Sequence, residues 1–131
     1  MKVVVERREW RRGRGHSALY SCDEFVGGKF VVSQYCVIGQ VLRELGVPPD
    51  RLRSVSTPRN LDSRTRRGLP AWLFELQFHE KRTAMLPQGA VWRAMRLNDA
   101  EGLSESEREL RLTQILAEVG VELVFTDERN V

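Results

Sequence analysis

Residues 33–46 read Ser-Gln-Tyr-Cys-Val-Ile-Gly-Gln-Val-Leu-Arg-Glu-Leu-Gly, and the rest of the chain is organised around this stretch. Five apolar residues recur there at the spacing of one helical face: Tyr35, Ile38, Val41, Leu42 and Leu45. Ser33 is a suitable N-cap, and Gly46 followed by Val47-Pro48-Pro49 is a strong stop signal. The pattern predicts one amphipathic helix over 33–45.

Strands are predicted on both sides of this helix because several short runs are rich in β-branched or alternating apolar residues. Gly27-Gly28 is a favourable hairpin turn between two of them. Trp72, Phe74, Leu76 and Phe78 alternate with other residues, which predicts a strand with one buried aromatic face. The predicted strands span 2–6, 18–26, 29–32, 72–78 and 121–126.

A second long helix is predicted over 104–119. Ser104 and Glu107 form a capping-box pattern at its start, and Gly120 closes it. Proline at the start of 48–52 favours a short helical turn. Residues 90–97 fit either a strand or a helix, with the helix slightly favoured. Residues 53–70 are predicted to be one long, exposed and mobile basic loop, because they contain few apolar residues.

The fold class expected from this order is α+β. A chain of 131 residues with 41% apolar and 30% charged residues has the composition of one soluble domain, so a single domain over 1–131 is expected. The two main helices would pack on a mostly antiparallel sheet that includes Trp72–Phe78 and Val121–Thr126.

A cytoplasmic location is expected, in the cytoplasm of the host if the protein is encoded by a phage. No apolar run approaches the length of a membrane span, and Met1–Val5 leads directly into a charged stretch rather than a signal-peptide core. Cys22 and Cys36 are then expected to be reduced thiols in the core.

The net charge of +3 hides an uneven distribution along the chain. Residues 1–20 carry a net +4, residues 51–67 a net +5, and residues 99–131 a net −6. Arginine supplies most of the positive charge, and its planar guanidinium suits paired contacts with carboxylates or phosphates. The sequence therefore predicts a molecule with basic and acidic poles.

Motifs for catalysis or cofactor binding are weak. Residues 13–18 match the glycine pattern of dinucleotide sites, but the strand and helix that such a site needs are not predicted around them. The available Cys and His residues lack the spacing of metal ligands. A Cys36–His79 nucleophile pair is disfavoured because Cys36 lies beside the apolar helix stripe. No cofactor, no metal and no catalytic residue is predicted.

The two arginine clusters are the candidate binding sites. Like charges gathered in one segment repel each other, so their grouping favours a role in binding over a merely solvated surface. Tryptophan beside arginine is typical of interaction hot spots and of nucleic-acid surfaces. The candidate partner-binding residues are Trp10, Arg11, Arg12, Arg14, Arg59, Arg64, Arg66, Arg67 and Trp72.

Three short islands of the sequence form a recognisable set: Tyr35-Cys36-Val37-Ile38-Gly39 with Val41-Leu42, then Leu97-Asn98-Asp99, and Trp10 with Arg12-Gly13. In these islands the chain resembles a widespread family of small bacterial and phage proteins. The family usually has a second cysteine where this chain has Val37. The resemblance implies a small accessory or host-takeover protein. In size and split charge the chain is also similar to phage-encoded inhibitors that bind RNA polymerase.

Three functions follow as hypotheses. The first is a non-enzymatic, phage-type regulator that binds an acidic patch on a host protein complex, preferably the transcription apparatus. The second is a nucleic-acid-binding protein that uses the same arginines on phosphates. The third is an enzyme that holds a small anionic substrate with arginine. Neither a membrane partner nor a particular oligomeric state is predicted.

Overall fold

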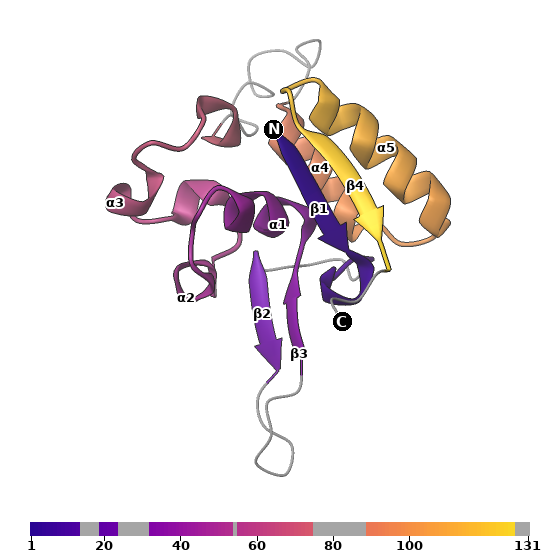
Figure 1. Cartoon of the computed structure of the whole chain (residues 1–131), viewed down its shortest axis with the longest axis horizontal. Helices are drawn as coiled ribbons and strands as arrows, with labels where there is room; N and C mark the ends of the chain where they lie inside the picture. Colours follow the sequence, from indigo (N-terminus) through magenta and orange to yellow (C-terminus); the bar gives the residue numbers. More distant parts are fainter. Residues whose placement is uncertain (14–18, 24–31, 54, 75–88, 128–131) are drawn as a thin grey trace.

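The computed structural model describes residues 1–13, 19–23, 32–53, 55–74 and 89–127 (Figure 1). Strands and helices are mixed along the chain, so the α and β character expected from the sequence is confirmed. In chain order the strands and α-helices are β1 Lys2–Glu6, β2 Tyr20–Asp23, β3 Val32–Tyr35, α1 Val37–Glu44, α2 Pro49–Leu52, α3 Ser63–Arg66, α4 Ala90–Asp99, α5 Glu105–Ala117 and β4 Glu122–Thr126. Three 3₁₀ turns join them: η1 Arg7–Glu9, η2 Pro58–Asn60 and η3 Ala71–Phe74.

The sheet arrangement differs from the prediction. β1 pairs with β4 in parallel, with Val4 opposite Val124, whereas β2 and β3 form a separate antiparallel pair. The prediction of a mostly antiparallel sheet was therefore wrong for the pair that packs against the long helices. The parallel pairing places the first and last strands side by side. Helix α5 lies between α4 and β4 in the chain and leads back to the sheet (Figure 1).

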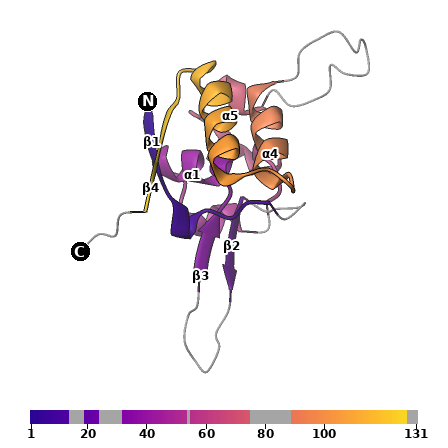
Figure 2. The same ribbon diagram turned by 90° about the vertical axis from the view of Figure 1, so that its right-hand side faces the viewer.

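The main core lies between the parallel strands and the helices. Val3 and Val5 of β1 are completely buried while Val4 between them is exposed, as the alternation of a one-sided strand requires. β1 lies beside α1, and β4 lies beside α5 (Figures 1 and 2). Ile38 of α1 and Leu116 of α5 are both completely buried, so the core faces predicted for these two helices are confirmed.

Helix α1 begins later than predicted. Residues 32–35 belong to β3, and Cys36 rather than Ser33 caps the helix, because the Cys36 Sγ accepts a hydrogen bond from the Gly39 amide at 3.4 Å. Gly39 is required at its position, since a Cβ there would lie 1.9 Å from the Leu19 carbonyl oxygen. Helix α1 therefore packs directly against the backbone at Leu19.

Helix α5 follows its prediction closely. The Ser104 hydroxyl accepts a hydrogen bond from the Glu107 amide at 3.2 Å, which confirms Ser104 as the N-cap. The Glu107 carboxylate pairs with Arg111 one turn later. Helix α4 settles the choice left open for 90–97 in favour of a helix, and α2 confirms the turn predicted over 48–52.

The strand predicted over 72–78 was wrong in the part of it that the structure describes. Residues 71–74 form a 3₁₀ turn rather than the start of a strand, and the buried side chain is Leu73 rather than the aromatic residues on either side of it. The turn follows Pro70, whose carbonyl accepts a hydrogen bond from the Leu73 amide at 3.2 Å. The rest of the predicted strand, 75–78, lies outside the described residues.

Residues 53–70 are not one irregular loop. They include η2 and α3, and Asp62 caps α3 by accepting a hydrogen bond from the Thr65 amide at 2.7 Å. Pro58 and Leu61 are buried against the rest of the protein. Two apolar side chains and one cap thus order a segment that the composition alone predicted to be unstructured. No helix within the described ranges is long and apolar enough to cross a membrane.

Candidate partner-binding surfaces

The N-terminal arginines are engaged within the protein itself. The Arg7 guanidinium donates two hydrogen bonds to the Glu109 carboxylate on α5, at 2.6 and 2.8 Å, and also lies 3.2 Å from Asp127. The hydrogen bond with Glu109 raises the pKa of Arg7 above its ordinary value. Arg12 pairs with Glu105 at the start of the same helix. Two arginines of the basic N-terminal segment therefore pair with carboxylates of the acidic C-terminal segment.

Trp10 belongs to the core. Its side chain is 2% exposed, and its indole Nε1 donates a hydrogen bond to Asn98 Oδ1 at 2.6 Å. The Arg12 guanidinium covers the ring at 4.2 Å from the centroid, and Arg11 is itself only 9% exposed. Trp10 and Arg11 thus have almost no surface to offer a partner, although both are on the predicted list. Arg14, also predicted, lies outside the described residues.

Asn98 is the centre of a buried hydrogen-bond network. Its Oδ1 accepts from Trp10 and from the Val37 amide at 3.0 Å. Its Nδ2 donates to the Arg11 carbonyl at 3.0 Å and to Asp99 Oδ1 at 2.9 Å. The carboxamide therefore makes the four hydrogen bonds it can readily make. It ties the N-terminal segment, the start of α1 and the end of α4 together.

Arg108 has a similar structural role beside it. This side chain is 4% exposed, and its Nη1 donates to the carbonyl oxygens of Leu97, Asn98 and Ala100 at 2.8, 3.1 and 2.7 Å. These carbonyls lie in the last turn of α4 and directly after it, where the helix itself supplies few donors. The Leu97 carbonyl also accepts from the Ala100 amide, and the Asn98 carbonyl from the Gly13 amide. A buried arginine on α5 thus caps the neighbouring helix.

The arginines between residues 51 and 67 are arranged differently. Arg51, Arg64 and Arg67 are exposed and line one surface pocket of about 380 Å³. The apolar part of the pocket wall comes from Leu45, Val47, Pro48 and Leu69. We call this the loop arginine surface. Asp62 is its nearby carboxylate, 3.6 Å from Arg51, and both side chains are largely exposed.

The other predicted residues lie around this surface rather than in its pocket. Arg59 is exposed on η2, and Arg66 lies over the Phe74 ring at 4.7 Å from the centroid. Trp72 is partly buried and packs against the core. Of the predicted residues, Arg64 and Arg67 line the pocket, whereas Arg66 does not. Arg51 also lines the pocket and is not on the predicted list.

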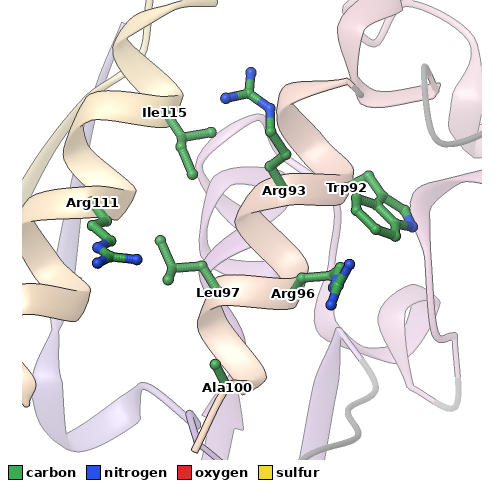
Figure 3. Close-up of a pocket in the computed structure, with 7 residues that line it drawn as sticks. All are labelled: Trp92, Arg93, Arg96, Leu97, Ala100, Arg111 and Ile115. Atoms are coloured by element: carbon green, nitrogen blue, oxygen red, sulfur yellow. The ribbon is translucent and has the colours of Figure 1, made fainter. Parts of the chain in front are cut away.

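A second surface, between α4 and α5, was not predicted. Its groove of about 360 Å³ is lined by Trp92, Arg93, Arg96, Leu97, Ala100, Arg111 and Ile115. Figure 3 shows Leu97 and Ile115 facing each other across the space between the helices, with arginines on both sides. The spacing of Trp92 and Arg96, one helical turn apart, is the signal that could have indicated it. That signal was usable only once 90–99 was known to be a helix.

Cys36, the nucleophile considered from the sequence, is buried at the start of α1. Burial raises the pKa of the Cys36 thiol to about 11, against the opposing effect of the Gly39 amide hydrogen bond. A thiol in that state is not a nucleophile at neutral pH. His16 and His79 lie outside the described residues, and the side chain of Cys22 is likewise not described. Within the described ranges, no three His, Cys, Asp or Glu side chains are grouped to hold a metal ion.

Comparisons with known proteins match no family model, no curated protein and no solved structure. The geometry of the two surfaces is therefore the basis for any functional inference.

Proposed function

We propose that the protein is a non-enzymatic regulator that binds an acidic surface of a larger protein through the loop arginine surface. The observation that carries the proposal is the arrangement of Arg51, Arg64 and Arg67, three exposed arginines around one pocket whose described lining includes no carboxylate. Asp62 lies beside the pocket, 3.6 Å from Arg51. Exposed charges contribute little to folding, so this grouping needs another reason. The N-terminal arginines, in contrast, have internal carboxylate partners.

The pocket wall favours a protein partner over nucleic acid. Leu45, Val47, Pro48 and Leu69 offer apolar contact that a phosphate backbone does not use. An apolar side chain flanked by carboxylates matches both parts of the wall. Such a side chain would fill the pocket, while the guanidinium groups would pair with the carboxylates and steer association. RNA polymerase from a bacterial host is the first partner to test.

The test has two stages. Tagged protein is first used to capture partners from a bacterial lysate, with and without nuclease, and purified RNA polymerase is assayed in parallel. The association rate of the captured partner is then measured for the triple variant Arg51→Ala, Arg64→Ala and Arg67→Ala. We expect capture that resists nuclease, and an association rate reduced roughly tenfold at low salt, with a smaller reduction at high salt because exposed charges are screened.

The matched control removes three exposed cationic side chains that line neither pocket, at Lys2, Arg8 and Arg53. An equal loss in both triple variants would mean that only net charge matters, which contradicts the proposal. Capture that disappears with nuclease, together with binding of random duplex that weakens as arginines are removed, would favour the nucleic-acid alternative instead.

A further inference from the structure

The groove between α4 and α5 is independent of the loop arginine surface and shares no residue with it. Its lining on α4 runs from Trp92 to Ala100, which is roughly 12 Å along the helix axis at 1.5 Å per residue. The two helices lie side by side (Figure 2). The groove therefore has the length of about two helical turns.

The floor of the groove is apolar. Leu97 and Ile115 pack against the core but are only partly buried, whereas Ala94 and Leu116 on the same helices are completely buried. Each helix thus has a second apolar position beside its core face, and Figure 3 shows both of these positions turned into the groove. Two partly buried apolar side chains facing each other leave room for a third element to pack on both helices.

The rim of the groove is basic. Arg93 and Arg96 come from α4 and Arg111 comes from α5. None of the described residues that line the groove is a carboxylate. Glu118 pairs with Arg93 and Glu107 pairs with Arg111, but these carboxylates are about half exposed, so the pairs cost little to exchange. Arg96 lies over the Trp92 ring at 4.6 Å from the centroid, which holds the guanidinium at the edge of the groove.

We propose that this groove binds an acidic amphipathic helix of a partner protein. Apolar side chains at positions i, i+3 or i+4, and i+7 of such a helix would contact Leu97, Ala100 and Ile115. Its flanking carboxylates would pair with Arg96 and Arg111, whose guanidinium groups each carry five N–H donors. Nucleic acid matches the rim but not the floor, since phosphates gain nothing from the apolar side chains.

The probe is a set of fluorescein-labelled 16-residue alanine-based helical peptides, with leucine at i, i+3 and i+7 and glutamate on both flanks. Binding to the whole protein is followed by fluorescence anisotropy. The groove variant is Arg96→Glu with Arg111→Glu. The matched control is Arg8→Glu with Arg53→Glu, two exposed arginines that line neither the groove nor the loop arginine surface. The control makes the same change in charge away from the groove.

We expect saturable binding to the unmodified protein, a loss of at least about tenfold in the groove variant, and less than about twofold in the control. A peptide with its leucines replaced by serine should lose binding although its charge is unchanged. Equal losses in both variants would show binding by net charge alone and would overturn the proposal. Absence of binding at about 1 mM peptide would also overturn the proposal. A dimer detected by light scattering would overturn it too if the groove variant dissociates that dimer, since a second copy would then occupy the groove. Both variants leave the loop arginine surface intact, so these results do not depend on the proposed function of that surface.

Discussion

The two arginine clusters are both rich in arginine but have different surroundings. Arg7 and Arg12 lie against an acidic helix and pair with Glu109 and Glu105. Arg64 and Arg67 lie on an exposed turn, with Asp62 as the carboxylate at their edge of the surface. Cluster composition alone does not separate these cases. The difference arises from which segments the fold brings together. It is the basis for proposing that the first cluster stabilises the fold and that the second binds a partner.

The buried network around Trp10 explains why the N-terminal segment is held in place. Asn98 joins it to α1 and α4 with hydrogen bonds that are shielded from water. Shielded hydrogen bonds are costly to break because the remaining groups stay unsatisfied. The strength of this anchor determines whether the N-terminal arginines can ever become available to a partner.

The largest effect is expected from Asn98→Ala. The substitution leaves the Trp10 indole N–H and the Val37 amide without acceptors, and it should lower the free energy of unfolding by roughly 2–4 kcal/mol. Urea denaturation followed by circular dichroism measures the change. Gln114→Ala on the exposed side of α5 serves as the control, with an expected change below about 0.5 kcal/mol. A similar small change for Asn98→Ala would show that the network does not hold the segment.

A smaller loss of folding stability is expected at high pH, because the Cys36 thiol loses its proton there. Its pKa is raised from 9.0 to about 11 in the folded protein, so the unfolded chain loses the thiol proton first as the pH rises. This contribution to stability is complete below about pH 9 and is lost between about pH 9 and 11. At full extent it is on the order of 2 kcal/mol.

The measurement compares urea denaturation of the unmodified protein and Cys36→Ser between pH 8 and 11. Serine keeps an oxygen that can cap α1 but does not titrate in this range. The unmodified protein should lose more stability than the variant over this interval. Parallel pH curves for the two proteins would show that Cys36 is not buried at the start of α1.

The smallest effect is the pairing energy of Arg7 with Glu109. A double-mutant cycle with Arg7→Ala and Glu109→Ala should give a coupling of about 1 kcal/mol, since the pair is bidentate and mostly shielded. The same cycle on Arg51 and Asp62 should give no measurable coupling because both side chains are largely exposed. Equal couplings would remove the distinction between the two clusters.

Local patterns predicted the elements whose signals were short-range. Ser104 and Glu107 located the start of α5, and Gly46 located the end of α1, because caps and stops depend on neighbouring residues. The partner of each strand depends on distant residues. The parallel pairing of β1 with β4 therefore had no local signal, and the alternation after Pro70 favoured a strand where a 3₁₀ turn forms.

The candidate site shows the same limit. Residues 53–70 were correctly identified as rich in exposed arginine, but the pocket also needs Arg51 and the end of α1. Trp10 matched the composition of a hot spot, and only the position of Asn98, far along the chain, makes it a core residue. The groove between α4 and α5 required both helices to be placed before its residues could be recognised as neighbours.

The assignment of the two clusters is tested most directly by one comparison of unfolding free energies in urea. The double variant Arg7→Ala with Arg12→Ala should lose about 2 kcal/mol, because two guanidinium groups leave carboxylates of α5 without partners. The double variant Arg64→Ala with Arg67→Ala should lose less than about 0.5 kcal/mol, as exposed positions do. Equal losses, or a larger loss in the second variant, would contradict the division of the arginines between folding and binding.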